Sequence, residues 1–138
     1  MTVNELAFPV LCLARDSSIT VADCRTALTR CNALAFFKNR YFDNLLVIDS
    51  RGATFRVTPA DYKQLSTVGH VVLCLTNGQM DVNLQLSPQR MSFAEVQESV
   101  LAWLDLAPEF WEASRDIKEW RDAVREAQSV SDLILLFR

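Results

Sequence analysis

The order of apolar segments along the chain constrains its fold more than any other feature. Short apolar runs typical of β-strands occupy the first 90 residues, and segments with helical periodicity follow them. Strands followed by helices are typical of α+β folds. We therefore predict an α+β fold with a mostly antiparallel sheet of about five strands, helices packed on one face and a helical C-terminal third. With 138 residues, half of them apolar, the chain is expected to form a single domain over residues 1–138.

Turn residues bound the expected strands. Residues 6–14 form an apolar run whose Pro9 cannot donate to a ladder, which predicts an edge strand or a bulge. Residues 45–49 and 54–57 flank Ser50-Arg51-Gly52 and predict a hairpin. Residues 71–76 and 79–86 flank Asn77-Gly78, a dipeptide typical of two-residue hairpin turns, and this turn would pair Leu75 with Met80.

Helical spacing and capping residues predict the remaining elements. The stripe Val21, Cys24, Leu28, Cys31, Ala35 predicts a helix from Thr20 to near Phe37, and Pro59 opens a short helix to about Leu65. Ser92 and Glu95 form a capping box at the start of a third helix. A long helix is expected from Pro108 through Ala127, with Trp120 in its apolar stripe. Residues 131–137 fit a short capped helix better than a strand, because Ser129 and Asp132 resemble a cap.

The cysteines and the lone histidine do not resemble a metal site. Cys12, Cys24, Cys31 and Cys74 include no CxxC pair, so we expect reduced, mostly buried thiols and no metal or cofactor. No apolar run approaches the ~20 residues of a membrane span, and the run at residues 6–14 lacks the basic flank of a signal peptide. We expect a cytoplasmic protein with no membrane contact.

Catalytic motifs are missing from the chain. It contains no GxGxxG, P-loop, GxSxG or HExxH sequence. His70 and Cys74 are four residues apart, roughly 13 Å along a strand, too far for a nucleophile and its base. Asp16, Asp49 and Asp81 could stand at strand ends, where turn acids also occur. We expect no catalytic residues and no enzymatic activity.

Basic and aromatic residues are interleaved between positions 25 and 56, which leaves single-stranded nucleic-acid binding as an alternative. Six basic residues in this region surround Phe36, Phe37, Tyr41 and Phe42. The chain as a whole carries a net charge of −3, which opposes nucleic-acid binding. We expect these aromatics to be core residues and no nucleic acid to be bound.

An acidic segment near the C-terminal third is the strongest candidate for a binding surface. Between Ser92 and Ala113 there are five acids and no base. Helical geometry puts Glu95, Glu98 and Asp105 on one side, opposite Val96 and Val100. Trp111 falls about 100° from the apolar stripe and is expected to face partly outward. A tryptophan among acids is typical of an interface anchor. The alternatives are that Trp111 packs at the rim of the core and that the acids are only the solvated face of an amphipathic helix. The predicted partner-binding residues are Glu95, Glu98, Asp105, Glu109, Trp111 and Glu112.

The first 60 or so residues resemble the immunity proteins of bacterial toxin–immunity systems. The resemblance lies in Leu6-Ala7-Phe8-Pro9-Val10-Leu11, in Asp16, and in Asp49-Ser50-Arg51-Gly52 leading into Phe55 and Val57. It implies a small cytosolic protein without an active site, which binds and blocks one cognate toxin. An acidic surface would suit a basic toxin domain. The alternative is a small structural or regulatory protein that forms homo-oligomers and has no toxin partner.

Overall fold

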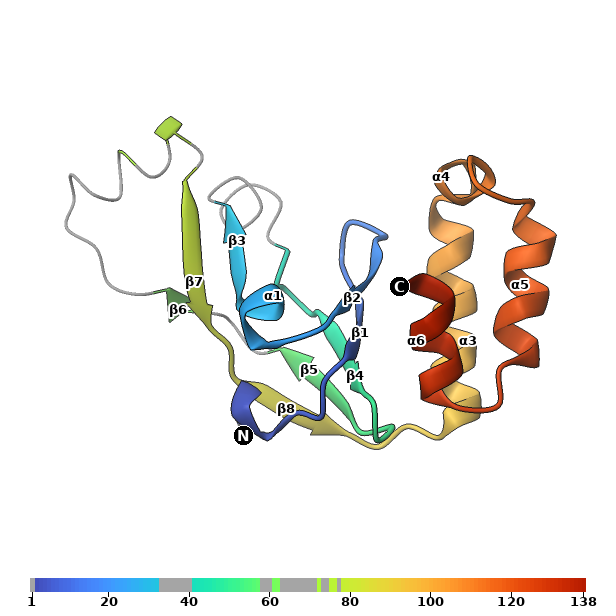
Figure 1. Ribbon diagram of the computed structural model, residues 1–138, viewed down its shortest axis with the longest axis horizontal. Coiled ribbons are helices and arrows are strands. Elements are labelled where there is room, and N and C mark those ends of the chain that lie inside the picture. Colours follow the sequence, from blue (N-terminus) through green and yellow to red (C-terminus); the bar gives the residue numbers. More distant parts are fainter. Residues whose placement is uncertain (1, 33–40, 58–60, 63–71, 73–74, 77) are drawn as a thin grey trace.

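The computed structural model describes residues 2–32, 41–57, 61–62, 72, 75–76 and 78–138. Within these residues the main sheet has five strands, all paired antiparallel in the order β2-β1-β4-β5-β8 (Figure 1). Its strands are β1 Val10–Leu13, β2 Ile19–Ala22, β4 Leu46–Asp49, β5 Thr54–Val57 and β8 Leu86–Gln89. The expected hairpin around Ser50-Arg51-Gly52 is confirmed by the pairing of Val47 with Phe55.

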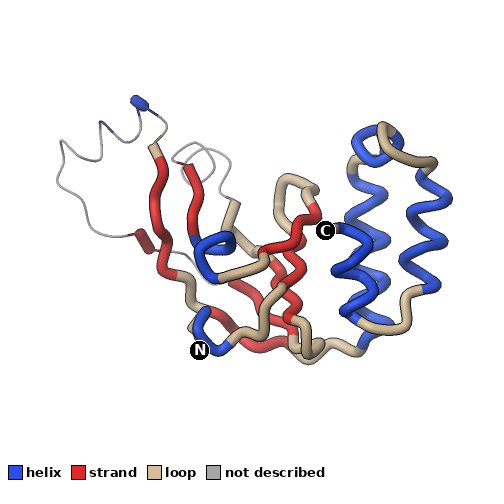
Figure 2. Tube along the Cα trace, viewed as in Figure 1, coloured by secondary structure: helices blue, strands red, loops and turns tan. Residues whose placement is uncertain are grey.

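Four helices form a layer over one face of this sheet, as Figure 2 shows. They are α3 Phe93–Leu106, α4 Pro108–Glu112, α5 Ile117–Glu126 and α6 Val130–Phe137. The predicted α+β class, with its antiparallel sheet and helical C-terminal third, is therefore confirmed. The Ser92–Glu95 capping box at the start of α3 is also confirmed, since the Ser92 side chain accepts from the Glu95 N–H.

The opposite face of the main sheet is covered by a second, smaller group of elements. It includes a short 3₁₀ helix, η1 Val3–Glu5, and α1 Arg25–Thr29, which line a common pocket. A second sheet has the order β3-β7-β6, with β3 Arg30–Asn32, β7 Gln79–Asn83 and β6 Asp61–Tyr62. The main sheet thus separates two apolar clusters, and the alternation of side chains along β1 sends Val10 to one and Leu11 to the other.

Strand β1 is interior, which corrects the expectation that Pro9 marks an edge strand. Both sides of β1 are paired, with β2 and with β4. Pro9 precedes the first strand residue, where its missing N–H removes no ladder hydrogen bond. The residues of β1 are all buried because the strand is covered on both faces, and this burial explains its unbroken apolar run.

The helix predicted from Thr20 to Phe37 is wrong. Its first residues form β2, which pairs with β1, and Cys31 lies in β3, which leaves only the five-residue α1 between them. The residues beyond position 32 lie outside the described part of the chain. Tertiary pairing with the apolar strand β1 overrides a weak helical stripe, because β-branched Ile19, Thr20 and Val21 suit a pleated sheet.

The hairpin predicted around Asn77-Gly78 is also wrong. Strand β7 pairs instead with β3 through residues 79–81 and with β6 through residues 82–83. Leu75 and Thr76 are helical, and the Thr76 hydroxyl donates to the carbonyl of Val72, four residues earlier. Pairing of β7 with strands distant in the sequence therefore outweighs the turn preference of Asn77-Gly78. The remaining residues of that segment are outside the described ranges.

Two further helix predictions need correction. The short helix predicted from Pro59 to Leu65 is contradicted at Asp61–Tyr62, which form β6, and its other residues lie outside the description. The long helix from Pro108 to Ala127 is two helices, because α4 ends at Glu112 and α5 restarts at Ile117. The Asp116 side chain caps the new helix by accepting from the Lys118 N–H at 2.7 Å. Residues 130–137 form helix α6, as predicted.

Candidate functional site

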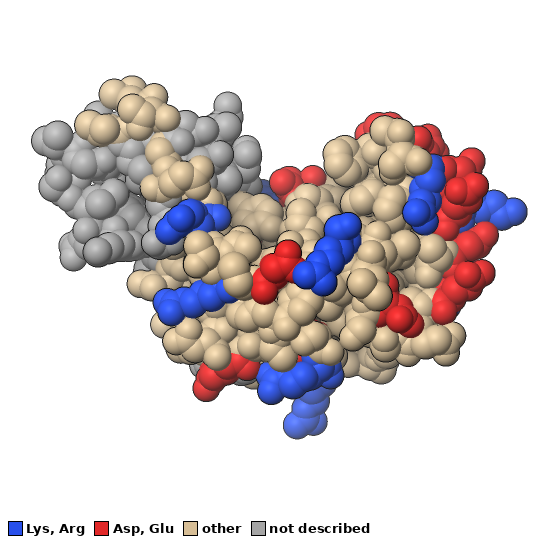
Figure 3. Space-filling model, viewed as in Figure 1, with Lys and Arg blue, Asp and Glu red and all other residues tan. Residues whose placement is uncertain are grey.

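The predicted acidic surface lies on the outside of the helical layer. Glu95, Glu98 and Asp105 are exposed on α3, while Val96 and Val100 on the opposite side are buried. Figure 3 shows acidic side chains gathered over the helical side of the molecule. Glu95 and Asp105 are ten positions apart, which corresponds to about 15 Å along the helix axis. The structure therefore separates Glu95 from the acids at the far end of the helix.

Trp111 is buried, which corrects the expectation that it faces outward. Only 7% of its surface is exposed, whereas the neighbouring Phe110 is 68% exposed. The expected orientation assumes one continuous helix from Pro108 to Ala127, and the break after Glu112 changes the position of Trp111 relative to Trp120. In the folded protein Trp111 packs inward against Trp120, and Phe110 contacts it edge-on from outside, with ring centroids 5.0 Å apart.

Trp111 belongs to an aromatic cluster that joins three helices. Its ring meets Trp120 of α5 and Phe137 of α6 edge-on, and Trp120 stacks on Phe137 at 5.4 Å. The Arg115 guanidinium lies over the ring of Trp120, 4.6 Å from its centroid. The Trp120 indole N–H donates to the Trp111 carbonyl, and this contact ties α5 to α4. Trp111 is thus a structural residue of the helical layer.

The corner between α3 and α4 combines exposed apolar and acidic side chains. Leu106, the last residue of α3, is 60% exposed, and Phe110 follows it on α4. The acids Asp105, Glu109 and Glu112 are exposed on the same two elements. We refer to these five residues, Asp105, Leu106, Glu109, Phe110 and Glu112, as the acidic corner.

The charges of the acidic corner are only partly neutralised within the chain. Asp105 pairs with Arg121 of α5. Within the described residues, Glu98, Glu109 and Glu112 form no ion pair. Glu95 is engaged locally, since its carboxylate accepts from the N–H and the hydroxyl of Ser92. Two acids at the corner therefore remain available to an external cation.

Asp49, which precedes the turn Ser50-Arg51-Gly52, is a buried structural carboxylate. It accepts from the backbone N–H groups of Ala7, Arg51 and Ala53 at 3.0–3.3 Å, and from the Arg51 guanidinium at 2.9 Å. Gly52 closes the turn with a φ of +88°, a region that favours glycine. The Asp49 turn therefore anchors the N-terminal segment to the end of β4.

Most of the basic and aromatic residues that the structure describes between positions 41 and 56 are buried or bound to other groups of the chain. Phe42 is buried, and Tyr41 is half-buried with its hydroxyl 3.3 Å from that of Thr20. Arg51 pairs with Asp49, and Arg56 donates to the Asn44 carbonyl. Phe36, Phe37, Lys38 and Arg40 lie outside the described residues.

Burial raises the pKa of three groups in the apolar cluster on the side of the main sheet away from the helices. It raises the pKa of the Cys12 thiol to about 12, of Cys31 to about 11 and of the Tyr41 phenol to about 12. The three cysteines that the structure describes are free, but Cys24 is exposed, which corrects the expectation that it is buried. Cys24 is the N-cap residue of α1 and not part of a helical stripe. Cys74 and His70 lie outside the described residues.

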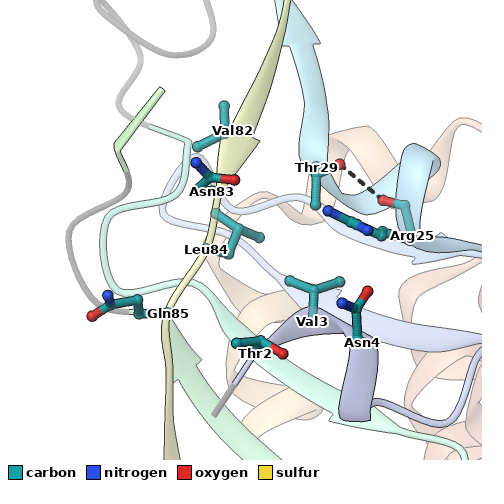
Figure 4. A pocket seen from close by; sticks show the side chains of 9 residues that line it. All are labelled: Thr2, Val3, Asn4, Arg25, Thr29, Val82, Asn83, Leu84 and Gln85. Carbon is teal, nitrogen blue, oxygen red and sulfur yellow. Dashed lines mark hydrogen bonds between the residues drawn. The ribbon is translucent and has the colours of Figure 1, made fainter. Parts of the chain in front are cut away.

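A pocket of about 250 Å³ lies on the other side of the molecule from the acidic corner. It is formed by η1, α1, β7 and the residues that follow β7, as Figure 4 shows. Its residues are Thr2, Val3, Asn4, Arg25, Thr29, Val82, Asn83, Leu84 and Gln85. Sequence reasoning missed this pocket because three distant segments build it, and none of them carries a motif.

Comparison of the chain with protein-family models, with curated proteins and with solved structures gives no match. Within its described part, the chain has no helix long and apolar enough to cross a membrane. The same residues contain no group of three histidine, cysteine or acidic side chains arranged to hold a metal ion.

Only part of the predicted site comes together in space. Asp105, Glu109 and Glu112 lie on consecutive elements, Glu95 and Glu98 lie farther along α3, and Trp111 lies beneath the surface. Phe110 is the functional candidate that sequence reasoning missed. The signal was present in Asp116, whose position before Ile117 is typical of an N-cap and would have indicated a new helix there.

Proposed function

We propose that this protein is a protein-binding module, and that its acidic corner binds a basic protein partner. The observation that carries the proposal is the exposure of Leu106 and Phe110 among acids. Large apolar side chains are costly to leave in water, and an apolar patch rimmed by polar groups is typical of an interaction site. Phe110 would be the anchor in place of Trp111.

The charge around the patch supports a basic partner. Glu109 and Glu112 form no ion pair within the described residues, and the segment from Ser92 to Ala113 contains no basic residue. An uncompensated acidic rim accelerates the approach of a basic surface and disfavours an acidic one. Self-association through the acidic corner would bring like charges together, which is why we favour a different chain over a second copy.

The resemblance of the first 60 residues to immunity proteins makes the proposal more specific. We propose that the partner is a toxin domain, which this protein blocks by occupying its surface, and that the protein itself has no catalytic role. In this proposal the Asp49 turn stabilises the fold, and the acidic corner between α3 and α4 binds the toxin domain.

Growth in the presence of the candidate toxin tests the biological role. The C-terminal domain of the protein encoded beside this one is expressed in bacteria with and without this chain. We expect growth arrest with the toxin domain alone and recovery when the two are co-expressed. A neighbour that does not arrest growth, or an arrest that this chain does not relieve, would reject the immunity role.

Binding kinetics test the acidic corner itself. Phe110→Ala should raise the dissociation rate of the pair and weaken binding by about 2 kcal/mol, roughly 30-fold in Kd. Glu109→Lys with Glu112→Lys should slow association and flatten its dependence on salt. Surface plasmon resonance at two ionic strengths measures both rates.

Matched controls distinguish the acidic corner from the rest of the helical layer. Leu135→Ala removes an apolar side chain that is also 68% exposed, but on α6, and Glu126→Lys reverses an acid at the other end of α5. Both controls should bind like the parent protein. If they weaken binding as much as the corner variants do, the acidic corner is not the interface. A self-associated species in sedimentation velocity that Phe110→Ala dissociates would favour the homo-oligomer instead.

A further inference from the structure

The pocket between η1, α1 and β7 has the composition of a small-anion site. Among the described residues that line it, Arg25 alone is charged, and none is acidic. Arg25 forms no ion pair within the described part of the chain. In Figure 4 its guanidinium extends across the pocket beneath Thr29, toward the strand that carries Leu84.

The floor of the pocket is apolar. Val3 of η1, Val82 of β7 and Leu84 beyond it are all buried, and they belong to the same apolar cluster. Asn4 of η1 and Asn83 of β7 also line the pocket, and the Asn4 amide can donate hydrogen bonds. A ligand that fits must therefore combine one anionic end with an apolar body.

The size of the pocket limits the ligand further. At about 30 Å³ for each water-sized group, 250 Å³ holds roughly eight non-hydrogen atoms. This is smaller than the ~300–1,000 Å³ of pockets for drug-sized ligands. A phosphate ester would bring two negative charges to a single guanidinium, whereas a carboxylate matches it with two parallel hydrogen bonds.

We propose that this pocket binds a small apolar carboxylate, with the carboxylate on Arg25 and the aliphatic body on Val3, Val82 and Leu84. The same chemistry is offered by a free short-chain acid and by the C-terminal residue of a peptide. The proposal is independent of the acidic corner, because the pocket lies on the opposite face of the main sheet from α3 and α4.

A titration followed by NMR tests the proposal on the intact chain. Hexanoate, with about eight non-hydrogen atoms, should shift the methyl resonances of Val3, Val82 and Leu84 with a millimolar dissociation constant. Hexanamide has the same size without the charge and should bind at least tenfold more weakly. Absence of shifts at these methyls, or equal binding of the acid and the amide, would overturn the proposal.

Variants that remove one positive charge test whether Arg25 binds the carboxylate. Arg25→Gln should weaken hexanoate binding about tenfold, whereas Arg90→Gln, which removes an exposed arginine outside the pocket, should not change it. Unchanged far-UV circular dichroism establishes that both variants fold. Equal binding to Arg25→Gln and the parent protein would show that the pocket does not use this guanidinium.

Two further ligands test whether the pocket prefers a free short-chain acid or the C-terminus of a peptide. N-acetyl-leucine resembles a peptide C-terminus whose carboxylate and aliphatic side chain would enter the pocket while the acetyl group stays outside, and N-acetyl-leucinamide lacks its charge. Tighter binding of N-acetyl-leucine than of hexanoate, lost in its amide, would assign the pocket to a peptide terminus. Tighter binding of hexanoate would assign it to a free acid. Binding of phosphate in preference to both carboxylates would overturn the assignment.

Discussion

Trp120 is held by three different kinds of contact at once. Its ring stacks on Phe137, the Arg115 guanidinium lies over its face, and its indole N–H donates to the Trp111 carbonyl. Because Trp111 and Trp120 share one cluster, truncation of either leaves a cavity between α4, α5 and α6. Phe110, only one residue from Trp111, is outside this cluster and contributes surface instead of packing.

Trp120→Ala and Trp111→Ala should each lower the free energy of unfolding by about 3–5 kcal/mol, because both remove a large buried aromatic side chain. Phe110→Ala should lower it by less than about 1 kcal/mol, since that ring is exposed. Urea denaturation of the three variants gives the comparison directly. If Trp111→Ala were as stable as Phe110→Ala, the packing described for α4 would be wrong.

Asp49→Ala should lower the free energy of unfolding by about 3 kcal/mol. The substitution removes the acceptor of three backbone N–H groups and the partner of Arg51, and leaves these donors unsatisfied in a part-buried site. Asp23→Ala is the control, because it breaks an exposed ion pair with Arg138 that is worth at most about 1 kcal/mol. Equal urea midpoints for the two variants would contradict the anchoring role of Asp49.

Thiol reactivity should differ sharply between the described cysteines. With a pKa raised to about 12, Cys12 is thiolate in only about one molecule in ten thousand at pH 8, and the thiolate is the reactive form. Exposed Cys24 should instead react rapidly with a chromogenic disulfide reagent. Cys24→Ser should therefore remove one fast-reacting thiol per chain, and Cys12→Ser should remove none. A fast phase that Cys24→Ser leaves unchanged would refute this assignment.

At the level of secondary-structure elements, the helical layer is joined by side chains that cap the backbone of a neighbour. The Gln97 amide of α3 donates to the carbonyls of Val124 and Ala127 at the end of α5, at 2.9 and 3.1 Å. The Trp103 indole N–H of α3 donates to the Ala14 carbonyl after β1. The Val124 and Ala14 carbonyls also accept from the backbone N–H groups of Ala127 and Ser17, so the side chains add a second donor there. These bonds set the position of α3 against both neighbours.

Gln97→Ala should lower the free energy of unfolding by about 1–2 kcal/mol, because the Val124 and Ala127 carbonyls both lose the Gln97 amide as a donor and α3 loses this tie to α5. Glu98→Ala, one residue along the same helix and exposed, should change it by no more than about 0.5 kcal/mol. Urea denaturation under identical conditions measures both. A Gln97→Ala variant as stable as Glu98→Ala would show that this cap contributes nothing measurable.

At the scale of the whole molecule, the main sheet is shared by two apolar clusters. Strands β1 and β4 contribute side chains to both of them, with Val47 on one face and Ile48 on the other. All three tryptophans of the chain belong to the cluster beneath the helices. Tryptophan fluorescence therefore reports on one side of the sheet only.

Val47→Ala should lower the urea midpoint equally by tryptophan fluorescence and by far-UV circular dichroism. The substitution removes about 2 kcal/mol of packing on the face without tryptophans, and a shared sheet transmits this loss to the whole molecule. A fluorescence midpoint that stays in place while the dichroism midpoint falls would show that the helical layer unfolds separately.

The elements that sequence alone predicted correctly are those whose signals are local. The Ser92 capping box, the Asp49–Gly52 turn and the burial of Val96 and Val100 on α3 depend on residues three or four positions apart, and each forms as expected. The order of strands and helices likewise determined the α+β class. In these cases the local preference and the tertiary structure agree.

Tertiary structure decided everything that depends on distant partners. Residues 19–22 became a strand because β1 offered an edge, and β7 paired with β3 and β6 instead of closing a hairpin at Asn77-Gly78. The break after Glu112 turned Trp111 inward and Phe110 outward, which moved the candidate anchor by one residue. The pocket around Arg25 exists only after three remote segments meet, because a sequence records neighbours along the chain and not those that burial of apolar surface brings together.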